Sequence, residues 1–306
     1  MRAHIGVLTW NRLALTRLCL ESLLAKTPEG YGLTVVDNGS QDGTQAYLRE
    51  LASAHPFMRV HLLRRNMGVA VASNLAWADA ASADCFVKLD NDVEILDGHW
   101  LQRLTCLLET YPHVGMAAYR LCAWHQLTRD TLPLTDGGYA EITTVCGGAC
   151  TAIGREAHEK IGFWNEGYGR YGHEDQDYSW RITKAGYALA ALDATDMVAH
   201  RGYAPGQVDE SLEAAKQQSN GALLSGDAAY HLYTFLFDEG LLPLKMPRKY
   251  VPRLEGEVWT FAFNPAFRPL QRLLNELVKT VPVDAKGRLT TVDLRAWRKA
   301  QGGTHG

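Results

Sequence analysis

Short apolar runs that end in polar clusters recur along the first 90 residues, and this order constrains the fold more than any other feature. Stretches with apolar residues at helical spacing separate the runs, which is the pattern of an α/β sheet with helices on both faces. We expect strands at residues 4–8, 33–36, 60–63 and 85–89. The polar clusters follow these strands, at the carboxyl edge where open α/β sheets bind ligands.

Helical spacing predicts most of the remaining elements. The chain from 117 to 139 looks less regular, and order returns near residue 143. A last short strand is expected at residues 197–199. Expected helices cover residues 13–26, 45–54, 66–80, 99–110, 178–185, 209–225 and 228–237, and a further one spans Leu270, Leu273, Leu274, Leu277 and Val278.

Several classes of protein are excluded by apolar patterning and cysteine spacing. The longest apolar stretches, such as residues 146–153, are far below the roughly 18 residues that a membrane-spanning helix needs. The first apolar run is about four residues, too short for the roughly 7–15 of a secretory signal core. The six cysteines show neither paired CxxC spacing nor histidines at zinc-finger spacing. We therefore expect a cytoplasmic protein with reduced thiols and no transmembrane segment.

Charge is unevenly distributed along the chain. Residues 1–240 carry 19 Lys and Arg against 29 Asp and Glu, a net −10, whereas residues 241–306 carry 12 against 5, a net +7. Such a basic region commonly meets phosphates, anionic glycans or membrane headgroups, so a peripheral membrane contact is one expectation. The alternative is that the basic region packs against the acidic remainder. The sequence gives no indication of the oligomeric state.

Asp90-Asn91-Asp92 directly follows an expected strand. Two carboxylates separated by one residue can converge on one hard divalent cation and leave the remaining coordination to phosphate oxygens and water. Acidic pairs are also common in turns, so this motif indicates a metal site only together with other motifs in the chain. Those motifs are three further segments in order, at residues 35–44, 65–74 and 172–181.

Together these four segments resemble the family 2 glycosyltransferases of the GT-A fold. The resemblance covers about residues 4–203 and implies a Rossmann-like mixed sheet flanked by helices. It divides the chain into a nucleotide-sugar glycosyltransferase domain, residues 1–203, and a mostly helical C-terminal extension, residues 204–306, basic from about 241, as a possible acceptor-binding region. The implied activity is a metal-dependent, inverting transfer from a nucleotide sugar, UDP first, to an acceptor hydroxyl.

The resemblance implies roles for particular residues on the donor side. Asp37 matches the acid that accepts a hydrogen bond from the base or ribose, and the alternative is an Asx-turn anchor. Asp92 matches the direct ligand of Mn²⁺ or Mg²⁺, Asp90 reaches ribose or the metal, and His200 closes a strand end as a further metal ligand. The remaining residues expected to line the nucleotide sugar are Thr9, Asn11, Arg12, Arg65, Asn66, Gly68, Asn74 and Asn91.

The catalytic residues implied by the resemblance are Asp175 and Glu174. An inverting transfer needs a carboxylate base for the acceptor hydroxyl, which matches Asp175, while Glu174 would bind an acceptor or sugar hydroxyl. The alternative is that these acids and Asp177 only cap the following helix. Expected acceptor contacts are Gly148, Trp164, Tyr171 and His173.

Other functions fit the motifs of this sequence less well. A nucleotidyltransferase should have a glycine-rich basic loop after the first strand, and a dinucleotide oxidoreductase a GxGxxG motif, and neither is present. A non-catalytic nucleotide-sugar-binding relative would keep Asp37 with a damaged DxD or acid pair, but both are intact. The acceptor is expected to be a glycan or lipid-linked glycan. The basic residues and aromatics after 241 leave a hydroxylated base of modified viral DNA as the alternative acceptor.

Overall fold

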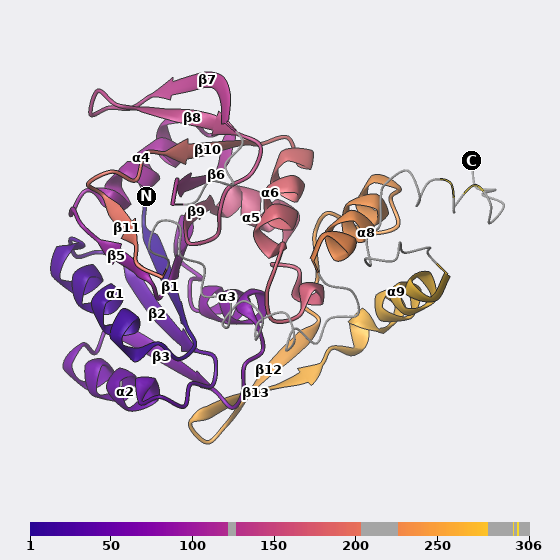
Figure 1. Ribbon diagram of the computed structural model, residues 1–306, viewed down its shortest axis with the longest axis horizontal. Helices are drawn as coiled ribbons and strands as arrows, with labels where there is room; N and C mark the ends of the chain where they lie inside the picture. The colour runs from indigo at the N-terminus through magenta and orange to yellow at the C-terminus, as the bar shows by residue number, and fades with distance from the viewer. Residues whose placement is uncertain (122–126, 203–225, 281–295, 297–298, 300–306) are drawn as a thin grey trace.

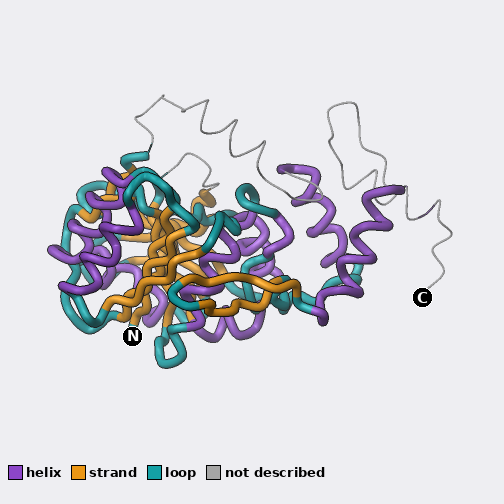
Figure 2. The backbone as a smooth tube through the Cα atoms, turned by 90° about the horizontal axis from the view of Figure 1, so that it is seen from below, coloured by secondary structure: helices purple, strands orange, loops and turns teal. Residues whose placement is uncertain are grey.

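The computed structural model describes residues 1–121, 127–202, 226–280, 296 and 299. In these ranges an 11-stranded mixed sheet runs through the molecule between helices (Figure 1, Figure 2). A second sheet pairs β5 (Val93–Ile95) with β11 (Val198–His200). The large sheet has the order β12 (Tyr250–Glu255), β13 (Val258–Phe263), β3 (Met58–Leu63), β2 (Gly32–Asp37), β1 (Ala3–Thr9), β4 (Cys85–Asp90), β9 (Cys150–Gly154), β6 (Val114–Tyr119), β10 (Ala188–Leu192), β8 (Tyr139–Thr143) and β7 (Leu127–Pro133).

Two apolar cores lie on the two faces of this sheet. One contains the buried side chains of α1, α2 and α4, and the other contains those of α3, α5 and α6. Each fully buried large apolar side chain stabilises the fold by about 1.5–3 kcal/mol. The helices are α1 (Leu13–Lys26), α2 (Thr44–Ala54), α3 (Val69–Ala78), α4 (Trp100–Thr110), α5 (Arg155–Ile161), α6 (Glu174–Lys184), α8 (Gly226–Asp238) and α9 (Arg268–Thr280), with short 3-10 turns at Glu166–Tyr168 and Pro265–Phe267.

The register of the central parallel strands places the polar clusters side by side. Thr9 at the end of β1 is opposite Asp37 of β2, and Leu8 is opposite Asp90 of β4. Next to β4, the antiparallel strand β9 begins opposite the end of β4, with Leu89 facing Cys150. The segment that precedes β9 therefore lies beside the DxD segment, as predicted for ligand binding at a carboxyl edge.

The C-terminal part that the structure describes shares the sheet and a core with the rest of the chain. β13 pairs in parallel with β3, with Trp259 opposite Leu63. Helix α8 packs on α6, and α8 and α9 share an apolar cluster with Tyr168 (Figure 1). The predicted helices at 228–237 and around Leu270 are confirmed, whereas the β12–β13 hairpin was not predicted. The helix expected at 209–225 lies outside the described residues.

Two other predictions need correction. The region 117–139 was expected to be irregular, but it contains the end of β6 and strand β7, and β8 begins at its last residue. The helix expected at 178–185 begins at Glu174, so the acidic residues form its first turn rather than precede it. Within the described ranges, every helix is too short or too polar to span a bilayer.

Candidate active site at the carboxyl edge of the sheet

The turn after β1 carries two consecutive residues in the left-handed conformation, Asn11 at φ 54° and Arg12 at φ 64°. Such non-glycine residues are uncommon and need surrounding contacts to hold them. The backbone N–H of Asn11 donates to Ser40 Oγ at 2.7 Å, and Asn11 Oδ1 accepts from the N–H of Gln41 at 2.9 Å. These two bonds join the turn after β1 to the turn after β2.

Asp37, at the end of β2, is fully buried and anchors the following turn. Its Oδ1 accepts from the N–H of Gly39 at 3.1 Å, from the N–H of Ser40 at 2.9 Å and from Gln45 Nε2 at 2.8 Å. Its Oδ2 is buried and has no hydrogen-bond partner among the described residues. The Asx-turn alternative is therefore present in the structure, and the second oxygen keeps the capacity to accept a hydrogen bond.

A buried amide joins β2 to the start of α3. Asn38 donates from Nδ2 to the Gly68 carbonyl at 3.2 Å and accepts at Oδ1 from the N–H of Met67 at 3.0 Å. Gly68 has φ 95°, and a Cβ there would lie 2.3 Å from the Gly169 carbonyl, so only glycine fits. Asn66 accepts from the Gly68 N–H at 2.9 Å, whereas Arg65 is exposed.

Asp92 lies between a guanidinium and an imidazole. Arg12 Nη1 is 2.8 Å from Asp92 Oδ2, and His200 Nε2 is 3.4 Å from Asp92 Oδ1. That Oδ1 is buried and accepts no hydrogen bond from the described residues. A Cβ on Gly202 would lie 2.1 Å from Asp92 Oδ2, so the chain after β11 passes directly against this carboxylate.

The residues around Asp92 fit a divalent cation as a partial ligand set. No group of three or more His, Cys, Asp or Glu side chains in the described part of the chain is arranged to hold a metal by itself. An orphaned carboxylate oxygen beside an imidazole nevertheless supplies the donors that Mn²⁺ or Mg²⁺ accepts. Cations held by one or two carboxylates usually complete their shell with substrate phosphates and water.

Asp90 is bound by a buried lysine of the same strand. Lys88 Nζ donates to Asp90 Oδ1 at 2.5 Å and to the Gly148 carbonyl at 2.6 Å. Burial alone would lower the pKa of Lys88, but the Asp90 carboxylate raises it above its ordinary value, so the amine stays charged. The N–H of Gly148 donates in turn to Asp175 Oδ2 at 3.2 Å. Gly148 thus lies between the DxD segment and the first turn of α6.

Glu174 and Asp175 open α6. Glu174 is 8% exposed and its Oε2 accepts from the N–H of Gly172 at 2.8 Å. Burial, with a further contribution from the adjacent Asp175 charge, raises the pKa of Glu174 to about 7. Asp175 is partly exposed and therefore accessible, and its Oδ1 accepts from the N–H of Gln176 at 2.8 Å. Two adjacent carboxyl groups thus sit in different environments.

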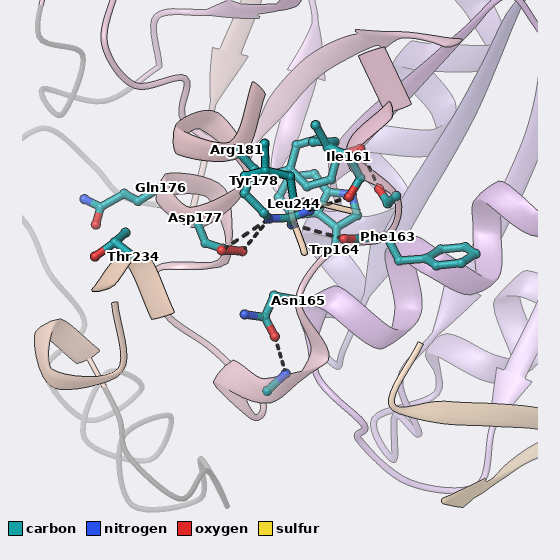
Figure 3. Close-up of polar contacts among 12 residues, drawn as sticks. Ile161, Phe163, Trp164, Asn165, Gln176, Asp177, Tyr178, Arg181, Thr234 and Leu244 are labelled. Atoms are coloured by element: carbon teal, nitrogen blue, oxygen red, sulfur yellow. Dashed lines mark hydrogen bonds and ion pairs between the residues drawn. The ribbon is translucent and has the colours of Figure 1, made fainter. Parts of the chain in front are cut away.

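A buried ion pair fixes the orientation of α6 (Figure 3). Arg181 and Asp177 both have fully buried side chains, and Arg181 Nε lies 3.1 Å from Asp177 Oδ1. Arg181 also donates to the Ile161 carbonyl at 2.8 Å and to the Phe163 carbonyl at 3.0 Å. Asp177 therefore pairs with Arg181 one turn further along the helix.

Two of the expected ligand contacts have fully buried side chains that contact other parts of the chain. Trp164, an expected acceptor contact, has no exposed surface and stacks on Tyr178 at 4.3 Å between ring centroids. Asn74, an expected donor contact, is also fully buried and bonds to the backbone of Trp164 and to Glu166 Oε1. Both residues support the loop that leads to α6.

Thr9 and Asn91 form buried hydrogen bonds beneath the carboxyl edge of the sheet. Asn91 Nδ2 donates to Thr16 Oγ1 at 2.8 Å and to the Asn11 carbonyl at 3.3 Å, and Thr9 Oγ1 lies 3.2 Å from the same threonine hydroxyl. These contacts fix the end of β1 against the DxD segment.

The expected acceptor side contains one exposed aromatic residue. Tyr171 is 40% exposed and precedes Glu174 and Asp175 in the chain. His173, at φ 62°, precedes α6 and stacks on Tyr230 of α8 with ring centroids 5.8 Å apart. The described C-terminal part therefore contacts the residue that directly precedes Glu174 and Asp175.

Three residues that hold the candidate site together were not singled out in the sequence. Lys88 could have been noticed as a lysine in an apolar strand, two residues before Asp90 and hence on the same face. Asn38 was read only as part of a turn. Glu166 gave no sequence signal, yet its buried carboxylate accepts from the N–H groups of Lys249 and Tyr250, 83 and 84 residues away.

A family model for glycosyl transferase family 2 matches residues 4–162, more than half of the chain. The chain belongs to glycosyl transferase family 2. This is the family that the sequence motifs predicted. A curated relative, the succinoglycan biosynthesis protein ExoA of Rhizobium meliloti (strain 1021), is 26% identical over 196 residues, with 58% of each protein covered. The chain thus spans little more than half the length of this relative.

Solved structures share the GT-A fold with this family 2 chain. GalNAc-T7 with UDP, GalNAc and Mn²⁺ superposes with a TM-score of 0.53 at 15% identity, covering 71% of this chain and 48% of that one. The mannosyltransferase PcManGT of Pyrobaculum calidifontis, in complex with GDP-Man and Mn²⁺, gives 0.52 at 17% identity, covering 99% and 76%. TarS of S. aureus gives 0.50 at 17% identity, covering 66% and 61%. These similarities establish the fold.

Proposed function

We propose that this family 2 glycosyltransferase moves a sugar from a nucleotide sugar, a UDP-sugar first, to a hydroxyl of a glycan or lipid-linked glycan, with inversion at the anomeric carbon. The observation that carries the proposal is the meeting of two carboxylate groups at one sheet edge. Asp90 and Asp175 are joined through Lys88 and Gly148, so the expected donor side and the expected base lie on either side of one glycine.

The donor side supports a nucleotide diphosphate. Asp37 Oδ2 can accept from an imide N–H of a pyrimidine or from a ribose hydroxyl once the groups that cover it move. Arg12 brings a cation to the turn beside Asp92. Arg65, exposed beside the Gly39 backbone, is proposed to face the nucleotide phosphates.

Asp92 and His200 would hold the divalent cation, with Asp90 next to them. When bound, the cation neutralises charge that grows on the leaving diphosphate. The structures of GalNAc-T7 and PcManGT that share this fold were each solved with Mn²⁺ and a nucleotide or nucleotide sugar, which supports the same class of cofactor here. Arg12 forms an ion pair with Asp92, and Lys88 forms one with Asp90.

Asp175 is the proposed base. It is partly exposed, and hydrogen bonds from Gly148 and Gln176 fix both of its oxygens. A carboxylate fixed in this way can accept the proton of an acceptor hydroxyl as the oxygen attacks the anomeric carbon. Glu174, with a pKa raised to about 7, can donate or accept a hydrogen bond at neutral pH and so orient a sugar hydroxyl.

A glycan acceptor is favoured over nucleic acid. The curated relative is a succinoglycan biosynthesis protein, and Tyr171 exposes an aromatic ring before the catalytic pair. In the basic region, Arg248 turns inward to Glu166 at 3.2 Å, and its side chain is only 13% exposed. Arg248 is engaged in an internal ion pair and therefore does not contribute to a phosphate-binding surface.

The test is transfer to acceptors of different classes. Purified protein with Mn²⁺ and each of several UDP- and GDP-sugars would be incubated with oligosaccharides, with lipid-linked glycans and with hydroxymethylated DNA. We expect a mass gain of one sugar on a carbohydrate acceptor with a UDP-sugar, and NMR of the product should show the inverted anomer. Retention of the donor's anomeric configuration, or glycosylation of the DNA alone, would contradict the proposal.

A further inference from the structure

Lys88 is a buried charge in the middle of the sheet. It lies in β4, where alternate side chains point to the same face, so Phe86, Lys88 and Asp90 face α6 together. Its side chain is 3% exposed. A lysine ammonium is rarely buried without partners, because removing it from water costs several kcal/mol unless charges and acceptors compensate it. The partners of Lys88 must therefore compensate for the burial of its charge.

Those contacts reach both halves of the site. Lys88 Nζ donates to Asp90 Oδ1 at 2.5 Å and to the Gly148 carbonyl at 2.6 Å. Gly148 then donates its N–H to Asp175 Oδ2 at 3.2 Å. A Cβ on Gly148 would lie 3.3 Å from Lys88 Nζ and 3.4 Å from Asp175 Cβ, so Gly148 packs closely against both residues.

We propose that Lys88 is a positioning residue that holds Asp90 and, through the backbone of Gly148, Asp175 at a fixed separation. The inference rests on the proposed function, because it assigns Asp90 to the donor and Asp175 to the acceptor hydroxyl. An ammonium is suited to this role because its three donors bind two partners at once and its charge balances the carboxylates that face it. The fields of Asp90, Glu174 and Asp175 all act on it.

The arrangement also predicts what an uncharged side chain would do. In Lys88→Met the apolar part of the side chain remains, but Asp90 loses its cation and the Gly148 carbonyl loses its donor. The backbone of Gly148 then loses one of the two hydrogen bonds that fix it, and the N–H that it donates to Asp175 is held less firmly. A displacement of about 1 Å at a reacting group can reduce the rate about 100-fold.

The experiment compares Lys88→Met and Lys88→Arg with wild type and with Lys26→Met. Lys26 is exposed on α1 and donates to the Leu96 carbonyl at 3.0 Å, so it is a lysine with one similar backbone contact away from the site. For each protein we would measure kcat and KM for the donor, binding of UDP with Mn²⁺ by calorimetry, and the thermal unfolding midpoint.

We expect Lys88→Met to lower kcat about 100-fold and to weaken Mn²⁺–UDP binding about 10-fold, the range found when a partner of a metal ligand is removed. Lys88→Arg should recover part of both, and Lys26→Met should match wild type. Folded Lys88→Met with kcat and binding within threefold of wild type would overturn the inference, as would a change in unfolding midpoint alone.

If Lys88→Met does not fold, the double variant Lys88→Met/Asp90→Asn removes the unpaired carboxylate as well and provides the comparison. The single variant Asp90→Asn, which keeps Lys88, is its reference. Transfer by the double variant at the rate of Asp90→Asn would overturn the positioning role. Absence of both turnover and nucleotide binding in wild type would instead contradict the proposed function itself.

Discussion

Arg12 Nη1 lies 2.8 Å from Asp92 Oδ2, so the turn after the first strand holds the carboxylate at the end of the fourth. Arg12 adopts a left-handed conformation to do so, and the other carboxylate oxygen of Asp92 is left buried beside His200. A buried carboxylate oxygen that accepts no hydrogen bond is the oxygen that a cation would stabilise most by binding. Asp92 is therefore the residue whose loss should affect metal binding most directly.

Asp92→Asn should weaken Mn²⁺ binding in the presence of UDP by more than the roughly 10–100-fold typical of changes in outer-shell partners. The amide keeps the shape of the side chain but removes the negative charge. Calorimetric titration of Mn²⁺ measures the effect. Asp97→Asn, at an exposed aspartate bonded to His99, is the matched control and should bind as wild type does. Equal affinities for the two variants would argue against Asp92 as a ligand.

Asp175→Asn should lower kcat about 10²–10⁴-fold, the usual contribution of a positioned base, with little change in the donor KM. The amide oxygen can still accept from Gly148, so the fold should persist. Steady-state kinetics at saturating donor measure this split. Asp193→Asn, a change at an exposed turn, should have normal kinetics. A large rise in donor KM with kcat unchanged would place Asp175 on the donor instead.

Glu174 should make stability depend on pH. Its folded-state pKa, about 7, is above the ordinary 4.5, so the folded protein binds the extra proton between these values. Stability contributed by protonated Glu174 is complete below pH 4.5 and is lost as the pH rises toward 7, because stability falls where the folded state binds more protons. Glu174→Gln removes this loss.

The difference in unfolding free energy between Glu174→Gln and wild type should therefore increase from pH 5 to pH 8. Each unit of pKa difference corresponds to about 1.4 kcal/mol. Urea unfolding at several pH values measures it. Glu159→Gln, at an exposed glutamate on α5, should show no such trend. A pH-independent difference for Glu174→Gln would mean that its carboxyl group is not perturbed by burial.

Arg181→Met should reduce the unfolding free energy by about 3–5 kcal/mol, because it leaves the fully buried Asp177 carboxylate without its cation. The double variant Asp177→Leu/Arg181→Met should recover part of the loss. Lys184→Met, which breaks an exposed pair with Asp238, should cost no more than about 1 kcal/mol. Denaturant unfolding of the three variants measures these changes. A similarly small loss of unfolding free energy in all three would show that the buried pair is no more important for stability than the exposed one.

The central strands and the edge that holds the site could be predicted from the sequence. The strands that end before Asp37 and Asp90 were expected within one or two residues, because apolar runs followed by turn-forming residues are local signals. His200 was expected at the end of a short strand, and that strand pairs with β5, so that His200 is opposite Val93. Local periodicity was therefore sufficient for the strands that bring Asp37 and Asp90 to one edge.

The remaining features depend on contacts between distant residues. Strand β13 joins the edge of β3 nearly 200 residues earlier in the chain, and no local pattern specifies that pairing. The role proposed for Lys88 depends on its hydrogen bond to the Gly148 carbonyl, which is 60 residues away in the chain. Trp164 was expected to meet a sugar because of its type, but its stacking on Tyr178 buries it. Residue type and neighbours in sequence cannot distinguish these cases.

Release of nucleoside diphosphate from a UDP-sugar by wild-type protein, measured first with Mn²⁺, then after EDTA, and again after Mn²⁺ is restored, tests the central claim most directly. We predict release with Mn²⁺, loss of release with EDTA, recovery on restoring Mn²⁺, and no release by Asp92→Asn under the same conditions. Release that continues undiminished in EDTA, or equal release by Asp92→Asn, would contradict metal-dependent transfer at this sheet edge.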